Sequence, residues 1–389
     1  MSAASEYLES EAVYTKLMQC AENLVQKKSS YSSTQSFPIS VISRKPSQIV
    51  WFFCGRDGNV YTSWWTEGQQ SPDGWKSLGG EFQAGSKVTA VAQRRDQIDV
   101  FVFHSGRVYT SWWNKHSDWS SLGGFFFVFK NIPFGERFAQ MVYPPTCPSG
   151  WQSIGGTCPR ASDVVAVARK ATHLDLFMCG SDENVRTPLF PPGANVSAVG
   201  RKSTDLDLFV CGKDEQVYTS HYDEGSNMWS DWSIIRGSHQ TPQFPVGANV
   251  SAVHRTASEL DVFVCGQDGQ VYTSHWDEEL TTWLDWSIVG DNQQISRFPS
   301  GAKISAVSQP AHKVHLFICS ANGRVYHSRK ENKWRKWEIV GDRQFPGATE
   351  VAAVHWRDNH LELFICDCNG VIWRRDFYYG NDWQEMSGH

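Results

Sequence analysis

The chain lacks the long apolar runs and the excess of positive charge that several classes of protein need. No apolar run approaches the roughly 18 residues of a membrane-spanning helix. The 36 Lys and Arg residues are outnumbered by 41 Asp and Glu residues, giving a formal net charge of −5. Nucleic-acid-binding domains normally carry a basic surplus. We therefore expect neither a membrane nor a nucleic acid among the partners.

A secretion signal and a disulfide scaffold are also missing. Glu6, Glu9 and Glu11 stand where a signal peptide carries positive charge. Ten cysteines are sparse for 389 residues, and six of them recur at one position of a sequence repeat, too far apart to pair. These six are Cys54, Cys179, Cys211, Cys265, Cys319 and Cys366. We expect them to be free and buried in a cytoplasmic protein. Cys147 and Cys158 flank a Pro/Gly loop, and a disulfide between them stays open.

The usual motifs of metal and nucleotide chemistry are absent. The chain has no HExxH, no paired CxxC, no EF-hand loop, no nucleophile elbow and no P-loop. We therefore expect no cofactor and no metal, and this absence leaves open whether the protein is an enzyme.

Tryptophan and glycine, with 18 and 31 copies, are abundant and follow a repeat. Its clearest copies span residues 195–237 and 249–290. Each contains four strand signals: V-S-A-V, then L-D-V-F-V-C-G with alternating polarity, then Q-V-Y-T-S-H, then W-x-x-W-S-I. Gly and Asp between the second and third suit a hairpin turn. Four short strands about every fifty residues are typical of a β-propeller blade.

The repeat recurs along most of the chain. The second-strand motif occurs at Val50–Gly55, Asp99–Phe103, Asp175–Gly180, Asp207–Gly212, Asp261–Gly266, His315–Ser320 and Glu362–Asp367. The fourth-strand tryptophan motif also occurs seven times, but the two series fall out of phase between Gly124 and Asp163. We predict an all-β fold, a β-propeller of about seven four-stranded blades (six are possible), over residues 37–389. Blades near 125–195 should be irregular.

Residues 1–36 form a separate extension in this interpretation. Tyr14, Leu17, Met18, Ala21, Leu24 and Val25 follow helical spacing, which predicts a short amphipathic α-helix. We expect it to pack on the propeller; a helix for a membrane or a partner is the alternative.

The repeat A-V-x-R…L-D-V-F-V-x-G-x-D-x-x-V-Y…W-W-x…W-x-S-L-G-G resembles the blade of the fucose-binding lectin propellers. It is closer to the bacterial seven-bladed type than to the six-bladed fungal lectins, and it covers roughly residues 37–389. The resemblance implies glycan binding between blades, in the fungal lectins through an arginine, a glutamate and a stacking aromatic. Here Asp99, Asp175, Asp207 and Asp261 stand in place of that arginine, and Thr62, Thr110, Thr219 and Thr273 near that glutamate. The fungal type of site is therefore expected to be absent, whereas a site with tryptophan walls stays open.

Pairs of aromatic or histidine residues on the third strands are the candidate ligand-binding residues. They are Trp64 and Trp65, Trp112 and Trp113, His221 and Tyr222, and His275 and Trp276. Adjacent residues on a strand face opposite sides, so one of each pair should enter a blade interface and the other face a groove. An exposed indole stacks on the apolar face of a sugar or on a flat apolar ligand. The alternative is that both belong to the core between blades.

Basic residues recur at the end of the first strand, which lines the central channel of a propeller. They include Arg44, Arg94, Arg169, Arg201, Arg255 and Arg357. As a basic ring they would hold an anionic ligand. Alternatively, they form cross-strand ion pairs with the acids that open the second strands.

Two functions follow from these features. The first is a lectin-like propeller with aromatic pockets for a glycan or another small molecule, gaining strength from several sites. The alternative is a cofactor-independent enzyme with one asymmetric apolar pocket, comparable to the fungal natural-product cyclases and pericyclases of the hetero-Diels–Alderase type. Its candidate residues in the irregular region are Tyr143, Trp151, Arg186 and Phe190. The oligomeric state is open.

Overall fold

The protein is described from a computed structural model. The structure describes residues 37–69, 72–114, 117–120, 126–132, 136–142, 151–153, 164–170, 173–179, 190–191, 193–202, 204–236, 241–256, 258–290, 298–310, 312–345, 350–357, 360–367, 370–380 and 382–386. The predicted N-terminal helix and the pair Cys147 and Cys158 lie outside these residues. In the described part of the chain, no helix is long and apolar enough to cross a bilayer.

The described strands form seven sheets, here named A to G in the order of their first strands along the ring. Sheet A contains β1 (Ile39–Lys45), β2 (Gln48–Cys54), β3 (Val60–Thr66) and β4 (Lys76–Ser77). Sheet B contains β5 (Val88–Arg94), β6 (Gln97–His104), β7 (Arg107–Asn114), β8 (Ser117–Ser120) and β11 (Gln152–Ser153). Sheet C contains β9 (Phe126–Ile132), β10 (Glu136–Val142), β12 (Val165–Lys170) and β13 (His173–Phe177).

The other four sheets follow the repeat more closely. Sheet D contains β14 (Val196–Lys202), β15 (Asp205–Cys211), β16 (Val217–Asp223), β17 (Met228–Trp229) and β18 (Ser233–Ile234). Sheet E contains β19 (Val250–Thr256), β20 (Glu259–Cys265), β21 (Val271–Asp277), β22 (Thr282–Trp283) and β23 (Ser287–Ile288). Sheet F contains β24 (Ile304–Gln309), β25 (Lys313–Cys319), β26 (Val325–Lys330) and β27 (Glu338–Ile339). Sheet G contains β28 (Ala352–Arg357), β29 (His360–Cys366), β30 (Ile372–Asp376) and β31 (Gln384–Met386).

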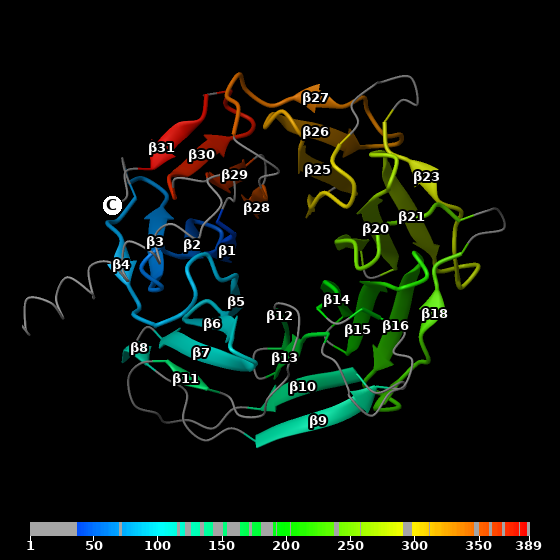
Figure 1. Ribbon diagram of the computed structural model, residues 1–389, viewed down its shortest axis with the longest axis horizontal. Coiled ribbons are helices and arrows are strands. Elements are labelled where there is room, and N and C mark those ends of the chain that lie inside the picture. Colours follow the sequence, from blue (N-terminus) through cyan, green and yellow to red (C-terminus); the bar gives the residue numbers. More distant parts are fainter. Residues whose placement is uncertain are drawn as a thin grey trace, which may run out of the picture. The chain divides into compact units, whose positions relative to one another are not determined.

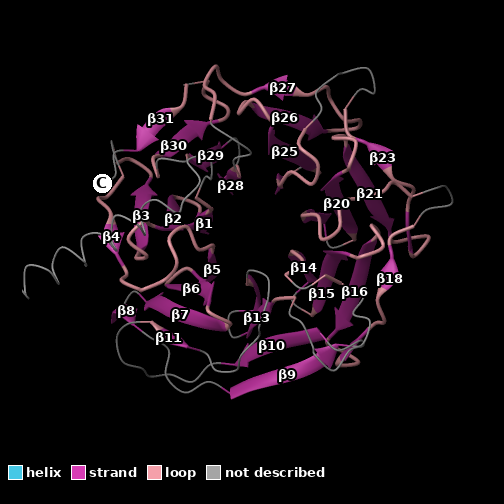
Figure 2. Ribbon diagram, in the orientation of Figure 1, coloured by secondary structure: helices cyan, strands magenta, loops and turns pink. Residues whose placement is uncertain are grey.

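The seven sheets close into a ring through their first strands. β1 contacts β5 on one side and β28 on the other, and β12, β14, β19 and β24 continue the series between them. Figure 1 shows the sheets arranged around a central space, with sheet G beside sheet A. Every regular element of the described residues is a strand (Figure 2). The prediction of an all-β propeller with about seven blades is confirmed.

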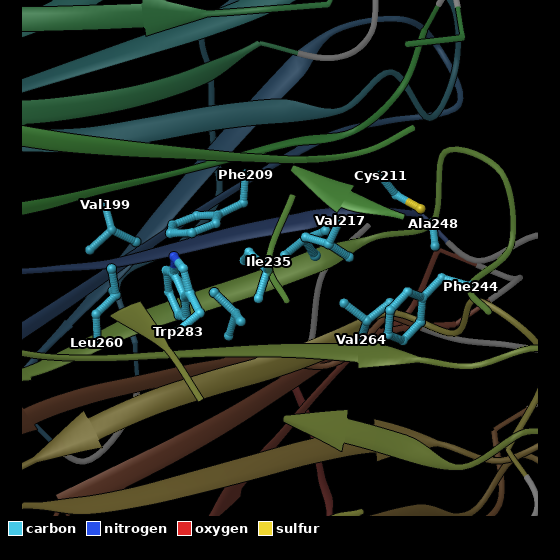
Figure 3. Close-up of a cluster of buried hydrophobic side chains, with 12 residues drawn as sticks. Val199, Phe209, Cys211, Val217, Ile235, Phe244, Ala248, Leu260, Val264 and Trp283 are labelled. Carbon is cyan, nitrogen blue, oxygen red and sulfur yellow. The ribbon is translucent and has the colours of Figure 1, made fainter. Parts of the chain in front are cut away.

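Alternation along the second strands places the core between neighbouring sheets. On β20, Leu260, Val262 and Val264 pack in the cluster shared with sheet D, which also holds Phe209 of β15 (Figure 3). Phe263 and Cys265, on the other face of β20, pack in the cluster shared with sheet F. Both faces of a second strand are therefore buried, which explains why these strands are apolar almost throughout.

The irregular region rearranges two sheets. Sheet C runs in the order β12-β13-β10-β9, so its two outer strands precede its two inner strands in the sequence. β11, which follows Trp151, pairs with β7 of sheet B instead of joining sheet C. This exchange explains why the second-strand and fourth-strand motifs fall out of phase here.

The six repeated cysteines are free and buried, as predicted. The Sγ atoms of Cys211 and Cys265 each lie 3.2 Å from a proline carbonyl of the next linker, at Pro245 and Pro299. Burial raises the pKa of each of these two thiols to about 11. The equivalent Cys54 has its pKa raised to about 11 for the same reason. These thiols are packing residues with little thiolate at neutral pH.

This burial predicts slow alkylation of the native protein. At pH 8, iodoacetamide is expected to modify Cys54, Cys211 and Cys265 at least about 100-fold more slowly in native buffer than in 8 M urea, because both the thiolate fraction and the access are low. Mass spectrometry of the alkylated peptides measures the rates. Equal rates in the two solutions would contradict the packing described above.

Candidate ligand-binding site

An aromatic wedge recurs between the third and fourth strands of most sheets. In sheet E the linker residue Phe244 packs edge-on against Tyr272 at 5.9 Å and lies 4.9 Å from Trp286, measured between ring centres. Equivalent phenylalanines fill the same place in sheets B, D, F and G: Phe82, Phe190, Phe298 and Phe345. Each wedge closes the space between its own sheet and the preceding one.

Sheet A departs from this pattern. Among the described residues, the ring that contacts both Tyr61 and Trp75 belongs to Phe53 of β2; most of the linker before β1 lies outside these residues. Phe53 stacks on Tyr61 at 5.6 Å and meets Trp75 edge-on at 5.0 Å. In sheet E the corresponding second-strand residue is the smaller Val264. Phe53 thus makes its ring contacts with Tyr61 and Trp75 from within sheet A.

A pocket lies at this junction between sheets A and G, here called the A–G pocket. It has a volume of about 300 Å³, at the lower end of the usual range for small-molecule sites. Sheet A contributes Phe53, Tyr61, Trp75 and the turn Gly55–Asp57, together with Phe37 before β1; sheet G contributes Gly370, Val371, Ile372 and Met386. A side chain added at Gly370, in the turn of sheet G, would meet no atom within 4 Å. At the equivalent turn glycines of sheets A and F, Gly58 and Gly323, an added side chain would clash with the backbone of the linker phenylalanine that follows.

The polar side of the pocket comes from the β2–β3 turn. Asp57 accepts hydrogen bonds from the Tyr61 hydroxyl at 2.7 Å and from Asn59 Nδ2 at 2.6 Å. Burial raises the pKa of Asp57, but these hydrogen bonds outweigh it and hold the pKa below its usual value. The carboxylate is therefore ionised at neutral pH. The same aspartate–tyrosine bond joins Asp268 to Tyr272, so it also stabilises the turn.

The pocket can hold a compact ligand that has one apolar face and one hydroxylated edge. Trp75, Tyr61 and Phe53 offer ring surfaces, and the Arg56 guanidinium lies 5.8 Å from the Phe37 ring centre at the polar side. None of these residues was among the candidates predicted from sequence. The signal that points to them is the second strand itself, where Trp51 and Phe53 replace the valines Val262 and Val264 of the repeat.

The predicted third-strand pairs lie at contacts between successive sheets. Trp64 packs in the cluster between sheets A and B, and its neighbour Trp65 packs in the cluster between sheets G and A. Trp65 meets Trp356 of sheet G edge-on at 5.6 Å. Trp112 and Trp113 likewise pack in two different clusters, on opposite sides of sheet B. Both members of these pairs are thus part of the packing between blades.

Three of the predicted basic residues form buried ion pairs. The side chains of Arg169, Arg201 and Arg255 are at most 11% exposed and pair with Asp175, Asp207 and Asp261 at 2.5–2.7 Å. The first-strand arginines Arg44, Arg169 and Arg201 also lie over an aromatic ring of a later sheet, at Trp113, Tyr222 and Trp276, with distances of 4.3, 5.1 and 5.9 Å. At Arg169, Arg201 and Arg255 the structure therefore shows cross-strand ion pairs and not an open basic ring.

The other two predicted arginines stand apart. Arg94 is exposed. Arg357, also exposed, pairs with Glu67 of sheet A and lies over Trp356 at 5.0 Å. The structure therefore does not bring all six arginines together around one ligand.

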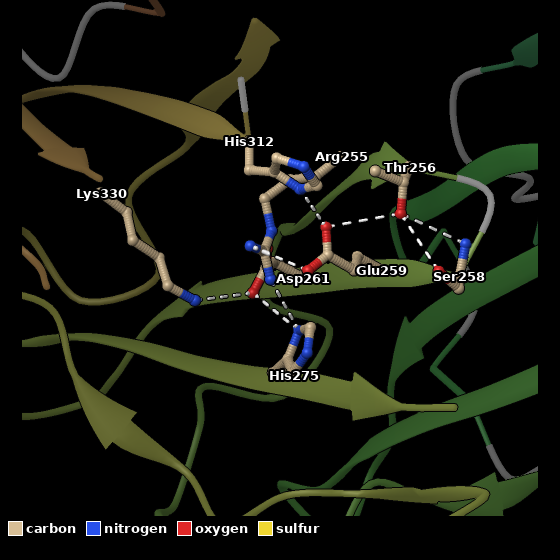
Figure 4. A network of polar contacts seen from close by, with 8 residues as sticks. All are labelled: Arg255, Thr256, Ser258, Glu259, Asp261, His275, His312 and Lys330. Atoms are coloured by element: carbon tan, nitrogen blue, oxygen red, sulfur yellow. Dashed lines mark hydrogen bonds and ion pairs between the residues drawn. The ribbon is translucent and has the colours of Figure 1, made fainter. Parts of the chain in front are cut away.

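His221 and His275 join these ion pairs. His275 Nδ1 lies 3.2 Å from Asp261 Oδ1, and the same carboxylate oxygen lies 3.4 Å from Lys330 Nζ of sheet F (Figure 4). Asp261 is fully buried, which raises its pKa, but His275, Lys330 and Arg255 outweigh burial and lower it. His221 makes the equivalent contact with Asp207 at 3.1 Å. The contact between Asp261 and Lys330 links sheet E to sheet F.

Two of the four predicted catalytic candidates are wedge residues. Trp151 packs on Phe82 at 5.0 Å and donates from Nε1 to the Leu78 carbonyl at 2.8 Å. Phe190 packs on Trp232 at 4.8 Å. Tyr143 and Arg186 lie outside the described residues. In the part of the chain that the structure describes, no three His, Cys, Asp or Glu side chains gather in a way that could hold a metal ion.

The comparisons with known proteins agree with the fold. No protein-family model and no curated protein matches the chain. Among solved structures it is similar to the BP39L lectin from Burkholderia pseudomallei, with 19% identity, a TM-score of 0.63 and coverage of 91% of this chain and 100% of that one. AofleA from Arthrobotrys oligospora matches with 14% identity and a TM-score of 0.52, covering 92% of this chain and 89% of that chain.

A third similar structure is the lectin of Aleuria aurantia, described as a six-bladed β-propeller with a novel mode of fucose recognition. It matches with 14% identity and a TM-score of 0.51, over 92% of this chain and 97% of that chain. At such identities the likeness shows a lectin-like propeller fold and nothing finer.

Proposed function

We propose that the protein is a lectin-like β-propeller that binds a glycan, or another small molecule with an apolar face, in the A–G pocket. The observation that carries this proposal is the pocket of about 300 Å³ beside Trp75, at a junction where Phe53 of the second strand supplies a ring in place of the valine of the repeat. Aromatic rings stack on the C–H face of a sugar, and the ionised Asp57 accepts hydrogen bonds from hydroxyl groups.

Among the sheets whose linkers the structure describes, no other has such a pocket. In sheets B, D, E, F and G a phenylalanine occupies the corresponding place, so the A–G pocket is not repeated there. Binding should therefore be monovalent, unlike that of a lectin with a site in every blade.

Calorimetric titration with methyl-α-L-fucoside, guided by a glycan array to better ligands, tests this function. We expect saturation at about one ligand per chain. Trp75→Ala should weaken binding by about 30-fold or more, as for a central aromatic contact. Trp286→Ala, the same position in sheet E, is the matched control and should leave the affinity unchanged. Absence of glycan binding, or equal losses in both variants, would contradict the proposal.

A second candidate is a cofactor-independent enzyme, a fungal natural-product cyclase or pericyclase of the hetero-Diels–Alderase type. The observation that favours it is the asymmetry of the A–G pocket, whose walls Phe37, Ile372 and Met386 are apolar. Such an enzyme would act by holding an apolar intermediate in a reactive conformation. If no glycan binds, the rate of cyclisation of an apolar polyene intermediate, with and without the protein and with Trp75→Ala, decides this alternative.

A further inference from the structure

The junction between sheets F and G contains two buried histidines at positions that the other blades fill differently. His315 occupies the second-strand position of Asp261, and His327 the third-strand position of Thr273. Their exposed fractions are 1% and 4%. The first-strand position of Arg255 is taken by Gln309. Sheet F therefore lacks the ion pair of the preceding blades.

The two imidazoles are directly bonded and covered by sheet G. His315 Nδ1 lies 3.0 Å from His327 Nε2, a contact that needs one N–H and one lone pair. Phe377, which follows β30, lies over His327 with 4.5 Å between ring centres. Next to it, the Tyr378 hydroxyl donates to Gln309 Oε1 at 2.6 Å and lies 3.4 Å from His315 Nε2. The position of Phe377 and Tyr378 is thus held by contacts with His327, Gln309 and His315 of sheet F.

The charges around this cluster disfavour protonation. Arg329 and Lys313 of sheet F and His355 of β28 face His315, and the carboxylate of Glu331 opposes them only weakly. Neither histidine pairs with a carboxylate in the described residues. Burial, with these positive neighbours, lowers the pKa of His315 to about 4 and that of His327 to about 3. A proton on the accepting ring would also remove the lone pair that joins the two imidazoles.

We propose that the F–G junction is a pH-sensitive latch, in which acidification releases the segment Phe377–Tyr379 from sheet F. This segment already has little cover, because Tyr378 and Tyr379 are 36% and 61% exposed. The closed form buries both imidazoles and so favours their neutral forms, while the open form exposes them to water and binds protons more readily. The latch is independent of whether the A–G pocket holds a ligand.

The direction and the size of the pH dependence of latch opening follow from proton linkage. Released histidines regain a pKa near 6.5, above the values of the closed form, so the latch is fully stable above about pH 6.5 and weakens as the pH falls toward 4. Between pH 7 and pH 5 the opening constant should rise about 20-fold if one histidine is protonated on opening, and on the order of 500-fold if both are.

Fluorine NMR of protein labelled with 3-fluorotyrosine tests the latch, with the Tyr378 resonance assigned from Tyr378→Phe. From pH 8 to pH 5, we expect the Tyr378 resonance to move toward the position of an exposed tyrosine, while Tyr218 and Tyr272 stay in place. An unchanged Tyr378 resonance over this range would overturn the proposal, and this result needs no variant to fold.

His327→Thr, which restores the residue of Thr62, Thr110, Thr219 and Thr273, should abolish the pH dependence of the Tyr378 resonance. His312→Gln, at an exposed histidine, is the matched control and should retain it. Retention of the full pH dependence in His327→Thr would show that another group controls the segment, and would also overturn the proposal.

Discussion

Replacing Asp261 with alanine is expected to lower the free energy of unfolding by about 3–5 kcal/mol. The carboxylate is fully buried and pairs with Arg255 at 2.6 Å, with His275 at 3.2 Å and with Lys330 of the next sheet at 3.4 Å. Alanine would leave the Arg255 guanidinium, whose side chain is 8% exposed, without its main partner. Removing one member of a buried ion pair costs more than the pair contributes, because the remaining charge stays out of water.

Urea unfolding followed by tryptophan fluorescence measures this loss. Glu259→Gln is the control, because Glu259 touches the same arginine at 3.5 Å but its side chain is 31% exposed. Exposed pairs contribute little, so this variant should lose less than about 1 kcal/mol. A loss at Asp261→Ala no larger than that of the control would contradict the inter-blade role of the network.

The second large effect is expected at the aromatic wedge. Phe244→Ala should lower the free energy of unfolding by about 3–5 kcal/mol, since Phe244 is fully buried between Tyr272 and Trp286 and its removal leaves a cavity. The surrounding rings belong to strands that cannot collapse into the space without losing their register.

Leu280→Ala is the control for this substitution. Leu280 is 64% exposed in the loop between β21 and β22, so its truncation should change stability by less than about 0.5 kcal/mol. The same urea titration measures both variants. Similar stability of the two would mean that the wedge does not hold neighbouring sheets together.

The two predictions concern opposite ends of the same blade. The Arg255–Asp261 pair lies at the β19–β20 turn. Phe244 packs toward the other end, where its carbonyl accepts from Gln267 of the β20–β21 turn and its backbone N–H donates to the Glu215 carbonyl of the β15–β16 turn. Adjacent blades are thus fastened by charge near one turn and by an aromatic ring near the other. At sheet A the second strand itself contributes a ring to this end, because Phe53 contacts Tyr61 and Trp75 beside the A–G pocket.

Much of the fold and the packing was determined by the sequence alone. The alternation of L-D-V-F-V-C-G identified the second strands, because a strand buried on both faces imposes a local pattern that every blade repeats. The recurring Arg and Asp at the ends of neighbouring strands pointed to cross-strand pairing for the same reason: Arg201 and Asp207 are only six residues apart. The repeated cysteines were recognisable as buried because their position in the repeat is constant.

The tertiary structure decided what depends on residues far apart in the chain. Whether β11 belongs to sheet B or sheet C follows from pairing with β7, some forty residues earlier, and no local pattern encodes that choice. The A–G pocket brings Phe53 and Ile372 together only because the first and last sheets meet when the ring closes. The repeat predicts how each blade packs against the next blade in the sequence. Sheets A and G are neighbours only because the ring closes, and the candidate site lies at their junction.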